Sequence, residues 1–114
     1  MSTCLFCDIA AGKIPCEQVH SDENFFAFRD ISPAAPTHIL IIPRTHISSL
    51  TELDETQTTM SGQLLVLASR LAAQENLDAN GYRFVINCGQ DGGQTVGHLH
   101  LHILGGRKLA WPPG

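Results

Sequence analysis

The chain has 114 residues, of which 43% are hydrophobic and 16% charged, and its formal net charge is −4 with six histidines counted as neutral. This apolar content predicts a folded protein, and the length suffices for one hydrophobic core, so we expect a single domain over residues 1–114. The acidic balance argues against nucleic-acid binding through phosphate neutralisation. No apolar run approaches the roughly 20 residues that a membrane span needs.

The cysteines and the first residues of the chain indicate the cellular compartment in which the protein is expected. Residues 1–4 carry neither the basic nor the apolar region of a signal peptide, so we expect a soluble cytoplasmic protein. Disulfides are rare in such a compartment, and cysteines there serve more often in packing or metal binding. Cys16 and Cys88 are expected to pack as small apolar residues. Cys4 and Cys7 differ because they are spaced Cys-x-x-Cys.

The first quarter of the chain predicts a short helix and a hairpin. A helix is expected over residues 6–11, ended by Gly12, since glycine is the usual residue beyond a helix end. Residues 16–20 and 24–29 then flank a polar turn, Asp22-Glu23-Asn24, and this arrangement predicts a β-hairpin.

A loop, a strand and a long helix are expected next. Two prolines stiffen the loop over residues 30–36, and the apolar run over 37–42 predicts a strand buried on both faces. Asp54 and Gln57 have the spacing of a helix capping box. The helix that follows has an apolar stripe expected to pack in the core, formed by Met60, Leu64, Leu67, Ala68, Leu71 and Ala72.

The last third of the chain predicts two more strands. The helix should end near Asn76, followed by a strand over residues 82–87, a polar glycine-rich loop over 88–97 and a strand over 98–104. The order of elements indicates an α+β fold with a mostly antiparallel sheet and its helices on one side.

Three of the six histidines lie in the last predicted strand. Side chains alternate along a strand, so His98, His100 and His102 should share one face, about 7 Å apart between neighbours, while the leucines between them enter the core. Three imidazoles at period two are hard to explain as chance surface residues. A zinc site and nucleophilic catalysis by an imidazole are the two chemical interpretations.

The loop before these histidines favours phosphorus chemistry. Residues 90–97 include three glycines, which let backbone amides approach an anion closely. Thr95 adds a hydroxyl donor and Asn87 an amide. Donors that converge beside an imidazole suit a phosphorus centre with developing negative charge.

Several motifs together resemble one family. Residues 98–104 resemble the His-φ-His-φ-His-φ-φ signature of the histidine triad (HIT) superfamily, where φ is apolar. Five further motifs are similar to its Hint branch, whose members are purine nucleoside phosphoramidases, and the resemblance covers nearly the whole chain. These motifs are Asp30-Ile31-Ser32-Pro33, Pro36-Thr37-His38, Gly92-Gly93-Gln94-Thr95, Leu104-Gly105-Gly106-Arg107 and Trp111-Pro112-Pro113-Gly114.

The resemblance implies a hydrolase of purine nucleoside phosphoramidates, with aminoacyl adenylates as further substrates. His100 would attack the α-phosphorus and form a nucleotidyl-histidine intermediate, expelling the amine, and water would then release the nucleoside monophosphate. His102 would contact the phosphate or the leaving group. The His98 carbonyl would bind Nδ1–H of His100 and leave Nε2 free, and His38 would complete a proton relay.

The resemblance also implies a site for a purine nucleotide of the AMP or GMP type. Asp30 would hold the ribose hydroxyls, and Asn87, Gly93 and Thr95 would contact the phosphate or leaving group. An apolar slot would receive the base with little discrimination between adenine and guanine. The residues implied for this slot are Phe6, Ile14, Phe28 and Ile31.

A HIT-like fold is implied as well, with a five-stranded, mainly antiparallel sheet, one long helix and one short helix. Two chains would form a homodimer through residues 81–87 and the long helix, joining their sheets into one ten-stranded sheet. Trp111, in the tail, would reach towards the partner's active site. We expect neither nucleic acid nor a membrane as a partner.

Some HIT proteins hold a structural zinc ion, and here the matching ligands are Cys4, Cys7, His46 and His98. Two thiolates and two imidazoles would make a closed tetrahedral site, which catalysis would not require. Other Hint members lack the cysteines and fold without metal. Bound zinc and two reduced thiols therefore both stay open as interpretations.

Two other functions stay open beside the phosphoramidase. A zinc-dependent hydrolase would use the histidines as ligands, although no Asp or Glu lies beside the triad to act as a base. A nucleotide-binding regulator with incidental hydrolysis would keep the same residues. Gly97 departs from the Hint pattern, in which an aromatic residue often precedes the triad.

Overall fold

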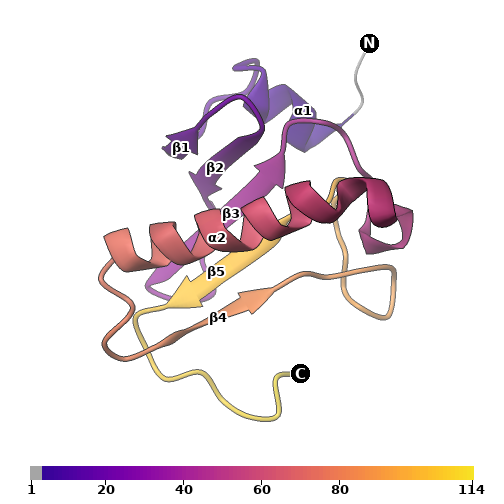
Figure 1. Cartoon of the computed structure of the whole chain (residues 1–114). Coiled ribbons are helices and arrows are strands. Elements are labelled where there is room, and N and C mark those ends of the chain that lie inside the picture. The colour runs from indigo at the N-terminus through magenta and orange to yellow at the C-terminus, as the bar shows by residue number, and fades with distance from the viewer. Residues whose placement is uncertain (1–3) are drawn as a thin grey trace.

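The computed structural model describes residues 4–114 (Figure 1). Residues 1–3, where we expect no signal peptide, lie outside the described part. The elements in chain order are α1 (Leu5–Ala10), β1 (Gln18–Ser21), β2 (Phe25–Arg29), β3 (Thr37–Pro43), two 3₁₀ turns (Leu50–Glu52 and Glu55–Gln57), α2 (Thr58–Gln74), β4 (Tyr82–Val85) and β5 (Leu101–Gly105).

The five strands form one antiparallel sheet in the order β1-β2-β3-β5-β4. β3 lies in the middle, and every residue of it after Thr37 is buried. Its continuous apolar run is explained by this place, because a central strand covered on both faces has no side that water reaches. The predicted α+β class and the five-stranded antiparallel sheet are confirmed.

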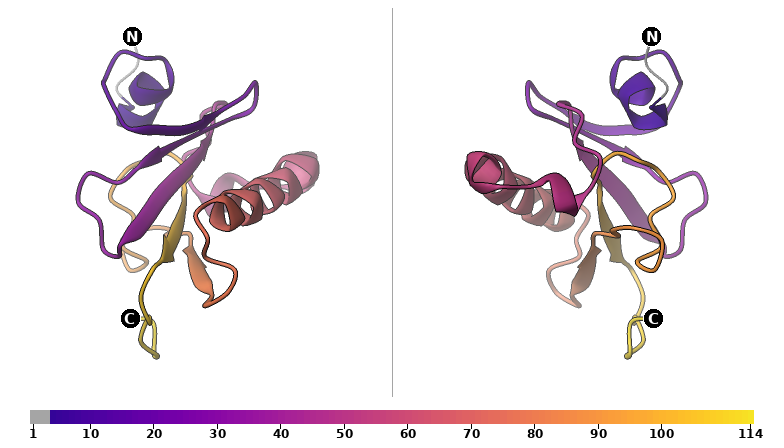
Figure 2. Two further views of the ribbon diagram at one scale, coloured as in Figure 1. Left: turned by 90° about the vertical axis from the view of Figure 1, so that its left-hand side faces the viewer. Right: turned by 90° about the vertical axis from the view of Figure 1, so that its right-hand side faces the viewer.

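The two helices cover opposite faces of the sheet, so the expectation of helices on one side was wrong (Figure 2). α2 packs on the face formed by Phe25, Ala27, Ile39, Ile41, Leu101 and Ile103. α1 packs on the other face, formed by Phe26, Phe28, Leu40 and Ile42. The alternation of side chains along β2 and β3 supplies apolar residues to both sides, and each side therefore needs its own cover.

α2 follows its predicted pattern. Asp54 and Gln57 form the predicted capping box, which opens the 3₁₀ turn that leads into α2. In the apolar stripe Leu64, Ala68, Leu71 and Ala72 are buried, and Met60 and Leu67 pack against them partly exposed. The helix ends at Gln74, two residues before the predicted end.

β5 begins at Leu101, three residues later than predicted, so His98 and His100 precede the strand. In the β3–β5 register, Leu99 would lie opposite Pro43, which has no N–H to donate. The N–H of Leu99 instead donates to the carbonyl of Ile47 at 2.6 Å. The ladder therefore stops. β4, predicted to reach residue 87, ends at Val85, which pairs with His102.

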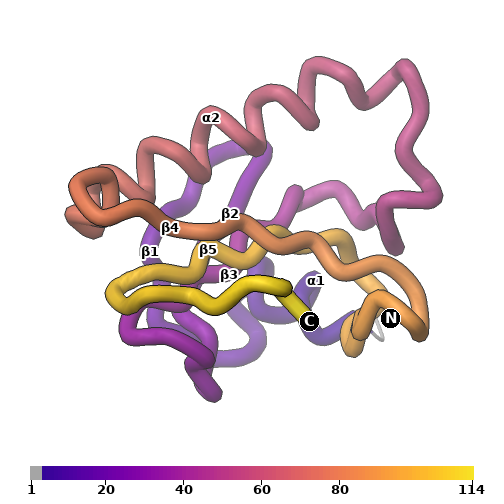
Figure 3. Tube along the Cα trace, turned by 90° about the horizontal axis from the view of Figure 1, so that it is seen from below, coloured from indigo at the N-terminus to yellow at the C-terminus, as the bar shows by residue number. Residues whose placement is uncertain are grey.

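The chain after β5 turns back beside β4 (Figure 3). Arg83 on β4 donates a hydrogen bond to the carbonyl of Ala110 at 2.8 Å, and its guanidinium lies 6.0 Å from the centre of the Trp111 ring.

Neither helix found in residues 4–114 has the length and apolar character that a membrane-spanning helix requires.

Candidate functional site

His100 is held in one tautomer by the residue two positions before it. Its Nδ1 lies 2.7 Å from the carbonyl oxygen of His98. A carbonyl only accepts hydrogen bonds, so Nδ1 carries the proton and the neutral ring has its lone pair on Nε2. The ring is 4% exposed and packs edge-on against Phe6, with centroids 4.9 Å apart. His100 thus has the nitrogen lone pair that a nucleophile needs.

His38 and His102, from β3 and β5, form a second hydrogen-bonded unit. The N–H of Ala34 donates to Nδ1 of His38 at 3.0 Å, so the other nitrogen, Nε2, carries the proton. That Nε2 donates to Nδ1 of His102 at 2.8 Å. The proton of neutral His102 is therefore on Nε2. The two rings are fixed in complementary tautomers across 64 positions of sequence.

Burial keeps these two rings uncharged. Burial is the main cause that lowers the pKa of His102 to about 4, and the neighbouring His100 and His38 add to the shift. Burial also lowers the pKa of His38, against the opposing effect of Asp30, whose Oδ2 lies 3.5 Å from Nε2 of His38. At neutral pH both rings are neutral, and His102 has a proton that it can give.

His100 and His102 line a pocket of about 280 Å³ on the α1 face of the sheet. Its other lining residues are Leu5, Phe6, Ile9, Ile14, Pro15, Cys16, Phe28, Arg29, Asp30, Ile31, Leu40, Thr95 and Val96. All four residues expected for an apolar slot are among them, as are Asp30 and Thr95. The side chain of Ile31 is 95% exposed, which places it at the outer edge.

The glycine-rich loop owes its shape to two amide side chains. Asn87 donates to the carbonyl of Gly92 at 2.6 Å, and Gln94 bonds the N–H of Gly89 and the carbonyl of Ser48. A Cβ at Gly92 would collide with the carbonyl oxygen of Cys88, so this turn requires glycine. Of the loop residues expected at the phosphate, only Thr95 lines the pocket. Asn87 and Gly93 lie in the loop without lining it.

Trp111 is not part of this pocket. Its side chain is 81% exposed beside Arg83, at the far edge of the sheet. Within one chain the tail therefore contributes nothing to the pocket. The predicted role of Trp111 involves the partner's site, which a single chain does not test.

Sequence reasoning missed several pocket residues, including Pro15, Leu40 and Val96. Leu40 lies directly opposite His102 in the β3–β5 register and so shares its face. The sequence carried a signal for it, since Leu40 is two residues from His38 in the same predicted strand. For Pro15 and Val96 there was none, because they reach the pocket through loop geometry.

A second cluster joins the start of the chain to the histidine segment. The ligand atoms of Cys4, Cys7, His46 and His98 lie within 4.8 Å of one another. Nδ1 of His98 is 3.3 Å from Sγ of Cys4 and 3.5 Å from Sγ of Cys7, and Nδ1 of His46 is 3.3 Å from Sγ of Cys7. α1 makes this possible, because Cys4 caps it and Cys7 lies one turn on.

The cluster fits a tetrahedral zinc ion. With Zn–S and Zn–N bonds of standard length, a sulfur and a nitrogen ligand are about 3.5 Å apart, close to the distances above. Nε2 of the fully buried His98 lies 2.8 Å from the carbonyl of Pro43 and must carry the proton, so Nδ1 offers its lone pair to the cysteines. Burial also lowers the pKa of His98, and a neutral imidazole is the form that binds a metal.

Asp30, His38 and His102 also place three ligand atoms within 4.8 Å. The two ring nitrogens are only 2.8 Å apart, the distance of a shared proton. Two nitrogens on one tetrahedral zinc ion lie about 3.3 Å apart. This group is a hydrogen-bonded relay in its geometry, rather than a metal site.

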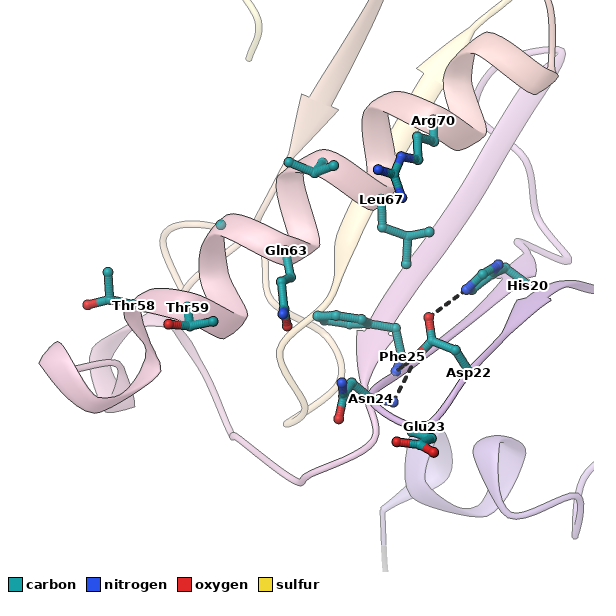
Figure 4. Close-up of a pocket in the computed structure, with 12 residues that line it drawn as sticks. His20, Asp22, Glu23, Asn24, Phe25, Thr58, Thr59, Gln63, Leu67 and Arg70 are labelled. Atoms are coloured by element: carbon teal, nitrogen blue, oxygen red, sulfur yellow. Dashed lines mark hydrogen bonds and ion pairs between the residues drawn. The ribbon is translucent and has the colours of Figure 1, made fainter.

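A larger hollow, about 750 Å³, is an open groove between the β1–β2 turn and α2 (Figure 4). It contains His20, whose Nε2 pairs with Asp22 at 2.7 Å. None of the other five histidines lines it. Its size does not make it the candidate site, because His100, His102 and the residues expected for the apolar slot all line the smaller pocket.

Comparison with known proteins agrees with the motifs. The HIT domain family matches residues 11–109 of the chain. A 14 kDa zinc-binding protein of Zea mays is 47% identical over 115 residues, covering 99% of this chain and 89% of the maize protein.

Two solved structures are similar to this chain over nearly its whole length. A HIT family hydrolase from Legionella pneumophila has a TM-score of 0.97 and 49% identity, covering 98% of this chain and 100% of its own. A histidine triad nucleotide-binding protein from Candida albicans has a TM-score of 0.81 and 30% identity, covering 96% and 83%. The chain belongs to the histidine triad (HIT) family.

Proposed function

We propose that this chain, as one HIT domain over residues 1–114, is a nucleotide-binding hydrolase that cleaves the P–N bond of purine nucleoside phosphoramidates. Aminoacyl adenylates would be further substrates. The observation that carries the proposal is the 2.7 Å bond from His100 Nδ1 to the His98 carbonyl, which leaves an imidazole lone pair beside an apolar pocket. The name of the Legionella hydrolase supports hydrolysis, and the name of the Candida protein supports nucleotide binding.

In the first step, Nε2 of His100 attacks the α-phosphorus and forms an N–P bond, while the bond from phosphorus to the amine breaks. Nε2–H of His102 gives its proton to the departing amine nitrogen, and Nδ1 of His102 can then accept the proton of His38. Thr95 and the loop amides stabilise the charge on the phosphoryl oxygens.

In the second step, water attacks the phosphorus of the nucleotidyl-His100 intermediate. Nε2 of His102 accepts a proton from this water while Nδ1 of His102 returns its proton to Nε2 of His38, the O–P bond forms and the N–P bond to His100 breaks. The products are the nucleoside monophosphate and free enzyme. Splitting one displacement into two gives each step a good leaving group.

The residues that line the pocket also support a nucleoside as part of the substrate. Phe6, Ile14 and Phe28 offer apolar surface of the kind that stacks on a purine base. Asp30 lies at the same pocket, and a carboxylate accepts hydrogen bonds from both hydroxyls of a ribose. Apolar contact reads the shape of a base rather than its edge, so adenine and guanine nucleotides should be turned over at similar rates.

The test is turnover of an adenosine phosphoramidate by wild type, His100→Ala and, as a matched control, His20→Ala in the distant groove. We expect His100→Ala to lose roughly 1,000-fold or more in kcat while AMP binding changes little, and His20→Ala to match wild type. Mass spectrometry of acid-quenched wild type should detect the nucleotidyl adduct.

Two results would overturn this proposal. Turnover that survives His100→Ala and stops with a chelator would indicate a zinc-dependent hydrolase. Tight AMP binding by a wild type that turns over no phosphoramidate would indicate a regulatory module.

We also propose that Cys4, Cys7, His46 and His98 hold a structural zinc ion. The maize relative is named a zinc-binding protein, and the donor set here has the spacing that zinc requires. When bound, zinc would tie α1 to the histidine segment. Four protein ligands leave no open position for water or substrate, which supports a structural role over a hydrolytic one.

A homodimer is the remaining proposal. β4 is an edge strand of the sheet, and Tyr82 on it and Leu65 on α2 are 37% and 51% exposed. Pairing two copies of β4 would give a ten-stranded sheet and cover an edge that otherwise invites aggregation. Light scattering coupled to gel filtration should give twice the chain mass, and a proline at Phe84 should give the single-chain mass.

A further inference from the structure

Arg107 lies outside the pocket, yet it reaches the loop that leads to His38. Its Nη2 donates to the carbonyl of Ala34 at 2.8 Å, and its Nη1 donates to the carbonyl of Lys108 at 3.0 Å. The preceding Gly106 packs tightly on the same loop, since a Cβ there would lie 2.8 Å from Cβ of Pro36. The segment after β5 therefore holds the second half of the loop over residues 30–36.

Ala34 is the link between this contact and the histidines. Its carbonyl is bound by Arg107, and its N–H is the group that donates to Nδ1 of His38 at 3.0 Å. The two groups flank the same Cα, so fixing the carbonyl restrains the direction of the N–H. The first half of the loop is held separately, by the N–H of Ser32 on Oδ1 of Asp30.

The direction of this N–H decides the tautomers of two rings. With Ala34 in place, Nδ1 of His38 accepts, Nε2–H donates to His102, and His102 keeps its own proton on Nε2. If the Ala34 N–H turned away, His38 could carry its proton on Nδ1. Its bare Nε2 would then accept from Nδ1–H of His102, and Nε2 of His102 would have no proton for a leaving group.

We propose that Arg107 is a positioning residue that sets the tautomers of His38 and His102 through the backbone of Ala34. The proposed effect of Arg107 on the two tautomers is argued from the hydrogen bonds alone. Its proposed effect on turnover rests on the proposed phosphoramidase function. Arg107 touches neither the pocket nor a site histidine. It therefore acts only by deciding which nitrogen of His102 carries the proton.

The first test needs no substrate. Long-range ¹H–¹⁵N spectra of the imidazoles at neutral pH should show His38 protonated on Nε2 alone in wild type. Arg107→Met keeps the bulk of the side chain but has no donor, and it should show His38 as a mixture of both tautomers. Arg107→Lys retains a donor and should return towards the wild-type spectrum. Arg70→Met, which removes an exposed charge on α2, is the matched control and should leave the spectrum unchanged.

The second test is kinetic. Arg107→Met should lower kcat for an adenosine phosphoramidate roughly tenfold, as the loss of an aligned general acid in part of the molecules implies, with KM within about twofold. Arg107→Lys should recover most of the loss. A wild-type His38 tautomer in Arg107→Met, or an equal kcat loss in Arg70→Met, overturns the proposal. If wild type turns over no phosphoramidate, the proposed function fails while the spectra still decide the role of Arg107.

Discussion

The backbone carbonyl of His98 accepts a hydrogen bond from Nδ1 of His100 at 2.7 Å, while the buried His98 ring points Nδ1 at two cysteine sulfurs. The backbone of His98 thus orients the proposed nucleophile, and its side chain belongs to the proposed metal site. His98 therefore connects the position of α1 to the position of the His100 ring.

Purified protein should contain about one zinc ion per chain by elemental analysis. Cys7→Ser should lose the metal, because serine does not replace a thiolate ligand. The variant's Tm should fall by about 5 °C or more, the change that roughly 1 kcal/mol causes in a domain of this size. Cys16→Ser, outside the cluster, should keep zinc and stability. A wild type prepared without chelator that holds no zinc would contradict the proposed site.

Acid should destabilise the fold through the buried histidines. The pKa of His102 is about 4 in the folded chain and near 6.5 when unfolded, so between these values the unfolded state binds more protons. Stability is therefore full above pH 6.5 and falls as the pH drops towards 4. Urea unfolding should show a loss of roughly 1–3 kcal/mol across this range.

His102→Gln is the comparison for that experiment. Glutamine has no proton to gain, so the variant's stability should depend less steeply on pH than that of wild type. The pKa of His38 is also lowered by burial, so this residue leaves part of the pH dependence in place. An identical slope in the variant would show that His102 is not the group responsible.

Two glycine-to-alanine substitutions should change the stability of the fold in opposite directions. Gly106 has φ of +91° and a Cβ there would lie 2.8 Å from Pro36, so Gly106→Ala should destabilise the fold by roughly 1–3 kcal/mol. Gly62 lies within α2 with open space around it, so Gly62→Ala should stabilise by up to about 1 kcal/mol. Denaturant midpoints measure both, and a stabilised Gly106→Ala would refute the close packing at Pro36.

Arg44 should matter for stability more than its partly exposed position implies. It donates to the carbonyls of Asp22 and Ala10 and to the hydroxyl of Ser21, and so ties the end of α1 to the β1–β2 hairpin. Arg44→Met should cost roughly 1–2 kcal/mol in urea unfolding. Arg70→Met should cost less than about 0.5 kcal/mol, because exposed residues without such bonds seldom contribute more. Equal effects would contradict the role of Arg44.

Local patterns in the sequence were enough to predict most of the helices and strands. The spacing of Asp54 and Gln57, the stripe on α2 and the apolar run of β3 each depend on neighbours within a few residues, and all three appear as predicted. The period-two histidines also predicted the segment that supplies His100 and His102 to the pocket, and the four residues that the family motifs imply for an apolar slot all line it.

The tertiary structure decided what depends on distant partners. Pro43 ends the ladder opposite Leu99, so His98 leaves the strand and its ring can meet the cysteines of α1. The β3–β5 register brings His38 within 2.8 Å of His102, and the chain beyond β5 brings Arg107 to Ala34. Residue types and local spacing are properties of the sequence, whereas tautomers are set by hydrogen bonds that exist only once remote segments have packed together.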